Sequence, residues 1–323
     1  MYAASRYNMF IVLARNSYGV SNMADNPNFG GEWTNEKLER LRKYLEAYQT
    51  IFHNNSNARK LSTTYVDAFA GSGKRIEPTS GVKSSQPSTF DLFSADDQAD
   101  AREFQKGSVE VALSLTKPFH FYRFIENNPD HVQELNQFID KQFQSMRDRI
   151  TITLGDANAE IEQWCNQTDW RKHRAVVFLD PYGMQVKWRT IEVVAQTTGI
   201  DMWLLFPLGQ AVNRLLTTKD KPPQKWAQRM TDLFGTDAWE AAFYTQSPQL
   251  ALFEDTSTPE KTATFQSIEK FFVERLESVF VEVAKPRALY NSRNNPLFLL
   301  CFAASNPKGA STAIKIAEYI LQH

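Results

Sequence analysis

Four acidic residues, each placed after a short apolar or aromatic run, are the residues of this chain best suited to chemistry. They are Asp67, Glu126, Asp156 and Asp180. Successive strands of an α/β sheet end at one edge, so we expect these carboxylates to lie close together there. Carboxylates in that position can accept hydrogen bonds from the hydroxyl and amino groups of a nucleotide-like ligand.

The first acid leads into a glycine turn. Asp67 and Phe69 are followed by Gly71 and Gly73, and glycines let a backbone approach a ligand closely. Asp67 could accept a hydrogen bond from an amino group of that ligand. The alternative is a strand that simply ends in a turn, because short glycine motifs often occur by chance.

Two further acids suit the nucleoside part of such a ligand. Glu126 ends the next strand-like run, where a ribose hydroxyl pair would need a carboxylate. Asp156, with Ala157, follows the third run and could contact an adenine amino group, or could cap the next helix, and the two roles are compatible. Four spaced acids favour S-adenosylmethionine and a methyltransferase over the dinucleotide of a dehydrogenase.

The run Asp180-Pro181-Tyr182-Gly183 is the sharpest signal for transfer chemistry. An acid, a proline and an aromatic ring at a strand end can hold an exocyclic amine and stack on its base. We expect catalysis to depend on Asp180, Pro181 and Tyr182. Taken alone, the run favours a tight Asp-Pro turn with a packed tyrosine, and only its register with the other acids favours the catalytic interpretation. No Ser-His-Asp set and no metal-ligating cluster is evident in the sequence.

These residues need an alternation of strands and helices to position them, and the hydrophobic pattern predicts one. The predicted strands form a mostly parallel sheet, and the C-terminal strands end it in a hairpin-like arrangement. Predicted strands are 65–69, 119–125, 150–154, 175–179, 202–206, 281–284 and 297–303. Predicted helices are 34–52 with Thr34 as N-cap, 109–115 with Ser108 as N-cap, 132–143, 157–164, 191–196, 268–279 and one from about 311.

Three segments interrupt the alternation. Residues 1–30 read as an extension, 74–106 as a long polar loop, and about 209–265 as a mostly helical insert. Residues 31–323 then form one methyltransferase-like domain, within reach of a chain of 323 residues of which 42% are hydrophobic. The expected fold class is α/β, Rossmann-like, with a seven-stranded sheet and an antiparallel C-terminal strand.

Composition bounds the partners. Thirty-six Lys and Arg against 37 Asp and Glu give a net charge of -1, so any nucleic-acid contact must come from a local patch. Basic residues cluster at 37–43, 171–174 and 219–225. We interpret these clusters as solvated faces, with nucleic-acid contact as the less favoured alternative. Two cysteines without neighbouring histidines indicate neither a zinc site nor a disulfide, and no apolar run is long enough for a membrane span, so we expect a cytoplasmic protein.

The chain resembles the three-Cys-motif partner (TcmP) proteins, a bacterial and phage-associated group with a methyltransferase-like core. The resemblance covers most of the chain from about residue 31. It rests on Trp33-Thr34 with Lys37 and Leu38, Asp67 to Gly71, Gly107-Ser108, Glu126, Gly155-Asp156, Phe178 to Gly183, Phe206-Pro207 with Arg214, and Leu297-Phe298 through Ser305. It implies a neighbouring cysteine-motif partner, with Gly183 and Arg214 on the substrate side.

Two functions follow as expectations. The first is an S-adenosylmethionine-dependent methyltransferase acting on an exocyclic amine of a base in RNA or DNA. The run Asp180 to Gly183 is similar to the Asp-Pro-Phe-Gly of tRNA guanine-N2 methyltransferases, whereas the lack of a second proline argues against an adenine-N6 enzyme. The second is a methyltransferase-shaped binding or assembly subunit without its own catalysis.

Overall fold

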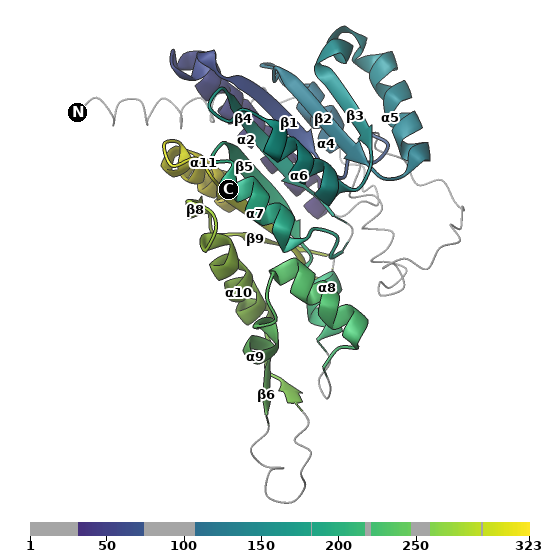
Figure 1. Ribbon diagram of the computed structural model, residues 1–323, viewed down its shortest axis with the longest axis vertical. Coiled ribbons are helices and arrows are strands. Elements are labelled where there is room, and N and C mark those ends of the chain that lie inside the picture. Colours follow the sequence, from purple (N-terminus) through teal and green to yellow (C-terminus); the bar gives the residue numbers. More distant parts are fainter. Residues whose placement is uncertain (1–31, 74–106, 182, 217–220, 247–258, 292) are drawn as a thin grey trace, which may run out of the picture. The chain divides into compact units, whose positions relative to one another are not determined.

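A twisted sheet forms the centre of the computed structural model, which describes residues 32–73, 107–181, 183–216, 221–246, 259–291 and 293–323. The strand order is β3-β2-β1-β4-β5-β10-β8, with β9 beside β10 as the eighth strand (Figure 1). The parallel strands are β1 (Ser62–Asp67), β2 (Phe121–Glu126), β3 (Ile150–Leu154), β4 (His173–Leu179) and β5 (Ile200–Phe206).

The C-terminal part of the chain completes the sheet in the opposite direction. β10 (Pro296–Ala304) runs antiparallel to β5, and on its other side pairs with β8 (Glu282–Val283) and β9 (Arg287–Tyr290). Five parallel strands followed by an inserted antiparallel strand are the sheet of a class I methyltransferase-like fold, as the sequence predicted. β9 was not expected, so within the described chain the sheet has eight strands instead of seven.

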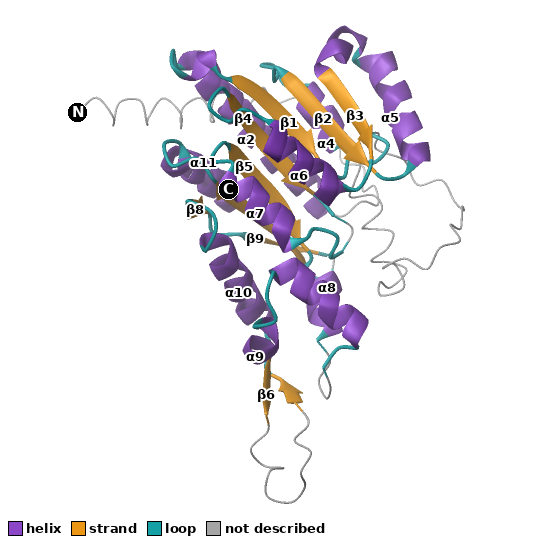
Figure 2. Ribbon diagram, in the orientation of Figure 1, coloured by secondary structure: helices purple, strands orange, loops and turns teal. Residues whose placement is uncertain are grey.

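Helices cover both faces of the sheet, as parallel strands require (Figure 2). One face packs against α2 (Glu32–Asn54), α4 (Ser108–Leu113), α5 (Pro129–Gln142) and α11 (Ala310–Gln322). The other packs against α6 (Ala157–Gln167), α7 (Trp188–Gln196) and α10 (Phe265–Glu277). Side chains alternate between the two faces along each strand, so Tyr65 and Asp67 point toward the α2 side and Val66 and Ala68 toward the other.

Two expected helix starts are wrong. The first helix begins at Glu32, so Thr34 lies inside it instead of capping it. Gly107, with φ of +134°, is the N-cap residue of α4, and Ser108 is the first helical residue. Because Ser108 is not needed as a cap, its hydroxyl is available to donate to Asp67.

The insert after β5 contains more than helices. It comprises η4 (Leu208–Asn213), α8 (Gln224–Phe234), α9 (Trp239–Phe243) and a small hairpin of β6 (Tyr244–Gln246) and β7 (Pro259–Lys261). A Cβ at Gly209 would stand 1.9 Å from the carbonyl oxygen of Pro296. Glycine is required there because η4 passes directly over the start of β10.

The described residues belong to one compact unit, Gly31–His323, and residues 1–30 and 74–106 lie outside the described part of the chain. Short 3-10 turns, Ala58–Lys60 and Gln144–Arg149, precede β1 and β3. Among the described helices, none is both long enough and apolar enough to cross a membrane.

Candidate functional site

Parallel pairing brings the four acids to one edge of the sheet. Asp67 pairs in register with Phe124 of β2 and with Phe178 of β4, so Glu126 and Asp180 each lie two residues beyond its neighbours. Glu126 in turn pairs with Leu154, two residues before Asp156. All four therefore stand at the carboxyl ends of neighbouring strands, the position at which open α/β sheets bind ligands.

A pocket of about 390 Å³ opens at this edge. Its volume is in the range of small-molecule sites. The pocket contains four of the residues expected to bind a cofactor, Phe69, Glu126, Asp156 and Ala157. The rest of its lining comes from Ala68, Asn127, Asn128, His131, Gly155, Asn158, Met184, Gln185, Lys187, Arg229 and Asp232.

Glu126 is held rigidly on the pocket wall. Its Oε2 accepts from the Gly71 N–H at 2.9 Å and its Oε1 from the Asn128 N–H at 2.8 Å. Burial raises the pKa of this carboxyl, but the His131 imidazole 3.7 Å away and the two backbone donors outweigh that effect and leave the pKa lowered. Glu126 is therefore an ionised acceptor, and the lone pairs that these donors do not use can receive hydroxyl groups.

Asp156 caps α6 and also faces the pocket. Its side chain accepts from the Ala159 N–H at 3.0 Å, and it is solvent-exposed. The two interpretations of this residue are compatible in the structure. Asn158, the second residue of the same helix, is buried, and its amide binds Gln185 O (3.0 Å), Lys187 N (2.9 Å) and Thr190 Oγ1 (2.9 Å). Asn158 thus fixes the segment that follows Asp180 to the start of α6.

Asp67 is completely buried behind the glycine turn. Its Oδ2 accepts from Ser108 Oγ at 2.5 Å and its Oδ1 from the Phe69 N–H at 3.2 Å. Burial raises its pKa to about 7; Ser108 opposes this, and the nearby Asp180 carboxylate adds to it. The pKa of Asp67 is thus shifted in the opposite direction from that of Glu126.

Asp180 forms a buried ion pair with Lys37 of α2. Lys37 Nζ lies 2.5 Å from Asp180 Oδ2, with side-chain exposures of 0% and 3%. Burial raises the pKa of Asp180 and lowers that of Lys37, while their mutual attraction opposes both shifts. Removing one partner of such a pair costs roughly 3–5 kcal/mol, because the other charge is left buried alone. The second oxygen of Asp180, Oδ1, is buried and has no hydrogen-bond partner among the described residues.

The two glycines of the turn have different surroundings. Gly71 (φ +58°) donates to Glu126, so it contributes to the pocket through that carboxylate. Gly73 (φ +73°) faces α5, where an added Cβ would stand 2.5 Å from Leu135 Cδ1. Neither lines the pocket itself. Ser72, between them, has a buried hydroxyl without a partner in the described part of the chain.

The remaining site candidates differ in their burial and in their position relative to the pocket. Pro181 is buried next to Asp180, and Tyr182 lies outside the described residues. Gly183 has φ of +65° with open space where a Cβ would be. Arg214 is exposed at the end of η4 and does not line the pocket. No group of three or more metal-ligating side chains occurs in the ranges that the structure describes.

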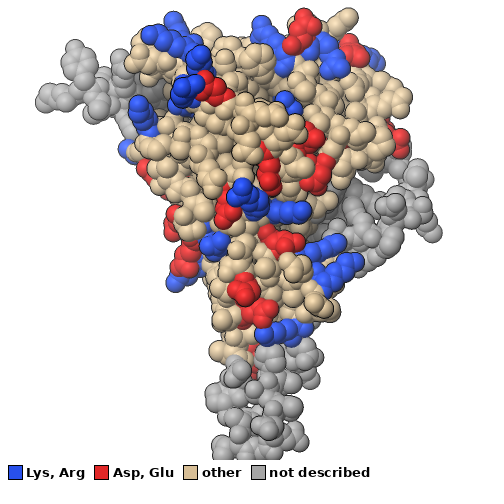
Figure 3. Space-filling view, viewed as in Figure 1, with Lys and Arg blue, Asp and Glu red and all other residues tan. Residues whose placement is uncertain are grey.

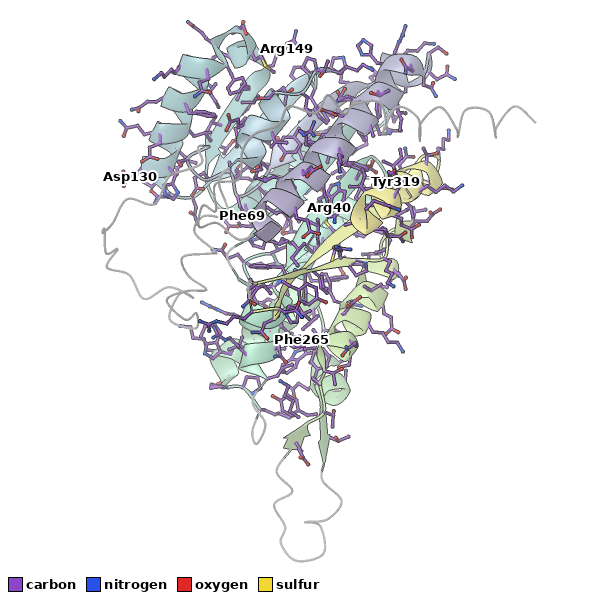
Figure 4. All side chains as sticks on the ribbon, turned by 180° about the vertical axis from the view of Figure 1, so that it is seen from behind. Arg40, Phe69, Asp130, Arg149, Phe265 and Tyr319 are labelled. Atoms are coloured by element: carbon purple, nitrogen blue, oxygen red, sulfur yellow. The ribbon has the colours of Figure 1, made fainter. Side chains whose placement is uncertain are left out.

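Lys37 corrects the interpretation of the 37–43 cluster as a solvated face. Lys37 is fully buried, and Arg40, also buried, donates to the Ile320 carbonyl of α11; Figure 4 shows Arg40 on α2 beside α11. The sequence did carry a signal, because Lys37 precedes Leu41 and Tyr44 by four and seven residues and so belongs to the buried stripe of that helix.

Other pocket residues had no such signal. Lys187 and the α8 residues Arg229 and Asp232 line the pocket although the sequence analysis did not select them. The cluster 171–174 lies just before and at the start of β4, whereas Asp180 follows the strand's end, about 20 Å from Arg174 at roughly 3.3 Å per strand residue. That basic cluster is thus at the opposite edge of the sheet from the site.

Comparisons with known proteins give similarity of architecture at low identity. No family model matches the chain, and no curated protein matches it. Among solved structures, protein LPL1258 of Legionella pneumophila (DUF519) is 10% identical, with 90% of this chain and 92% of that chain covered and a TM-score of 0.45. Trm1 of Pyrococcus horikoshii, solved with S-adenosyl-L-methionine, is 11% identical (91% and 61% covered, TM-score 0.42). The methyltransferase domain of bacterial CtHen1 is 9% identical (81% and 98% covered, TM-score 0.36).

Proposed function

We propose that this protein is an S-adenosylmethionine-dependent methyltransferase. The observation that carries the proposal is the convergence of Glu126, Asp156 and the turn after Asp67 on one pocket at the carboxyl edge of a methyltransferase-like sheet. Two of the pocket's carboxylates, the buried Glu126 and the exposed Asp156, match the hydroxyl and amino groups of an adenosine.

Each cofactor contact has a residue suited to it. Glu126 would accept from the ribose hydroxyls, and Asp156 with Ala157 would hold the adenine. Asp67 and the turn of Gly71 and Gly73, with Phe69, would hold the methionine end, and Asp67 would accept a hydrogen bond from its ammonium group. When bound, S-adenosylmethionine supplies a methyl group on a sulfonium sulfur that leaves as a neutral thioether.

We further propose that the methyl acceptor is an exocyclic amine of a nucleic-acid base. In this proposal Asp180 and Pro181 hold the amine, and Tyr182 is the ring that stacks on the base. Gly183 and Arg214 are proposed substrate contacts. The acceptor nitrogen gains the methyl group and loses one proton, which leaves along its hydrogen bond to Asp180. We also propose that the chain belongs to the TcmP group and acts with a cysteine-motif partner protein. Both parts of this proposal rest on the sequence motifs that carry the resemblance.

Calorimetry with S-adenosylmethionine and S-adenosylhomocysteine tests the cofactor assignment. Micromolar affinity corresponds to about -8 kcal/mol. Glu126→Gln keeps the side-chain volume but replaces one acceptor oxygen by a donor, so it should cost roughly 1.5–3 kcal/mol, or about 10- to 150-fold in affinity. Glu134→Gln, on the exposed side of α5, is the matched control and should bind as the parent does. Absence of binding by the parent protein would reject the assignment.

One observation favours the alternative of a binding subunit without catalysis. Asp180 is almost completely buried in its pair with Lys37, and a structural ion pair needs no substrate. Methyl transfer from labelled cofactor to cellular RNA and DNA, with and without the cysteine-motif partner, separates the two functions: cofactor binding with no transfer to any pool would favour the binding subunit.

A further inference from the structure

The buried cluster at the ends of β1 and β4 contains an acceptor that the protein itself leaves unfilled. Asp180 Oδ2 is taken by Lys37 at 2.5 Å, whereas Oδ1 has no hydrogen-bond partner in the described ranges. Buried carboxylate oxygens are almost always satisfied, because an unpaired buried charged acceptor loses its hydration without gaining a hydrogen bond in return. A donor from outside the described chain would complete Asp180.

The position of Lys37 determines which carboxylate oxygen of Asp180 remains without a hydrogen-bond partner. Its ammonium group is fully buried, and lies 5.6 Å from the ring centroid of Phe178, two residues before Asp180 on the same face of β4. The lysine reaches the cluster from the α2 side, so Oδ2 is occupied from that side. The other ionisable groups facing the pair are Asp67 and Tyr65 of β1.

The charges of Lys37, Asp67 and Asp180 also support a role for Lys37 in keeping Asp180 ionised. Lys37 is the cation that the structure pairs with Asp180, while Asp67 is held by the Ser108 hydroxyl and the Phe69 N–H. Without the ammonium group, two buried carboxylates would face each other, and both would favour the protonated form. A protonated Asp180 would have no charge with which to attract an amine and could not take up its proton.

We propose that Lys37 is a positioning residue for methyl transfer, holding Asp180 as a carboxylate with Oδ1 directed to one N–H of the acceptor amine. The inference rests on the proposed function. Oδ1 accepts that N–H, the nitrogen lone pair is thereby turned toward the methyl group, and the proton released from nitrogen passes to Oδ1. The donor in this proposal is the exocyclic amine of a base turned out of its strand.

Lys37→Met tests the proposal, because it keeps most of the side-chain volume and removes the charge. We expect cofactor affinity to stay within about twofold and the single-turnover rate to fall about 100-fold, the usual scale for a misplaced reacting group. The acid limb of the pH–rate profile should move up by about one unit or more, because Asp180 then ionises without its partner. Lys43→Met, on the same helix but partly exposed in a pair with Glu39, should change neither quantity.

A second variant covers the case in which Lys37→Met does not fold. The double variant Lys37→Met/Asp180→Asn removes both buried charges, and should transfer methyl groups at the same rate as Asp180→Asn alone. A slower double variant would show that Lys37 acts independently of Asp180 and would overturn the proposal.

Measurement of the ion pair itself provides a readout separate from activity. In the protein without cofactor, Lys37→Met should unfold at a lower temperature as pH rises from 5 to 8, whereas Lys37→Met/Asp180→Asn should not show this added pH dependence. Parent-like rate, pH profile and melting behaviour in Lys37→Met would overturn the positioning role while leaving the methyltransferase assignment intact. A faster Lys37→Met would show instead that Lys37 blocks the amine site. If the parent binds no cofactor, the proposed function itself fails.

Discussion

Asp67 and Asp180 are neighbouring buried carboxyls with different immediate partners. Lys37 pairs with Asp180, and Asp67 receives only neutral donors, Ser108 Oγ and the Phe69 N–H. Burial therefore dominates at Asp67 and raises its pKa to about 7. Burial raises the pKa of both adjacent acids, and the charged partner Lys37 opposes that shift at Asp180 through a direct ion pair.

Cofactor binding should therefore release a proton from Asp67. A methionine ammonium group beside this carboxyl favours its charged form, so binding removes the proton that Asp67 holds below pH 7. Affinity should rise with pH up to about pH 7, by at most tenfold per unit, and level off above it. Calorimetry in two buffers of different ionisation enthalpy measures the released proton. Asp67→Asn should bind more weakly and show no such pH dependence.

Two controls isolate this effect. His131 also lines the pocket, and imidazoles titrate in this pH range, so the measurement is repeated with His131→Gln, which should retain the proton release. Methylthioadenosine lacks the amino-acid part of the cofactor and should bind without it. If methylthioadenosine releases the same proton, Asp67 does not face the methionine end.

The site acids were predictable, and their partners were not. A carboxylate after an apolar strand-like run must lie at the sheet edge, whatever surrounds it, so Asp67, Glu126 and Asp180 followed from the pattern. The Asp180–Lys37 contact joins residues 143 positions apart, and it depends on how α2 packs on β4. Only the place of Lys37 on the buried stripe of its helix indicated that this lysine faces inward.

At the scale of elements, the site depends on how α6 holds the segment after β4. Asn158 joins them through Gln185 O, Lys187 N and Thr190 Oγ1, and Met184, Gln185 and Lys187 form one wall of the pocket. The amide is buried, donates once and accepts twice, so its three contacts restrict this wall to one arrangement.

Asn158→Ala should therefore weaken both the fold and the pocket. Loss of the amide leaves buried groups unpaired, and we expect roughly 1–3 kcal/mol lower unfolding free energy by denaturant titration. Cofactor affinity should fall as well, because the pocket wall is no longer fixed. Asn136→Ala on α5 removes two hydrogen bonds, to Val132 O and from Arg147, and should lower stability while leaving affinity unchanged. Equal affinity in both variants would contradict the anchoring role.

Helices and strands that contain an apolar run were predicted from the sequence. Strands that are held in place only by backbone pairing with a neighbouring strand were missed. The central strand β4 has five consecutive buried residues, and its pattern was clear from the sequence. In β9 only Leu289 is buried, and its position comes from the ladder with β10. The β6–β7 hairpin pairs only with itself in the described chain, so neither had a hydrophobic period from which to predict it.

At the scale of the whole molecule, charge is balanced and its local distribution matters more than its sum. The net charge is -1, and in Figure 3 the described surface mixes Lys and Arg with Asp and Glu. Of the basic groups considered from the sequence, Arg171 lies at the far edge of the sheet and pairs with Asp169. Lys225 and Arg229 instead occupy successive turns of α8, and Arg229 lines the pocket with Lys187.

We therefore expect the phosphates of a nucleic-acid acceptor to contact α8. Lys225→Gln combined with Arg229→Gln should weaken binding of single-stranded RNA or DNA, and should reduce the log–log salt slope by about 0.7 for each phosphate that the protein no longer neutralises. Arg171→Gln combined with Lys172→Gln removes the same charge at the opposite edge and should leave the slope unchanged. Fluorescence anisotropy at a series of salt concentrations measures both pairs. Equal slopes in all proteins would contradict the α8 contact, and salt-insensitive binding by the parent would favour a protein or small-molecule amine as the acceptor.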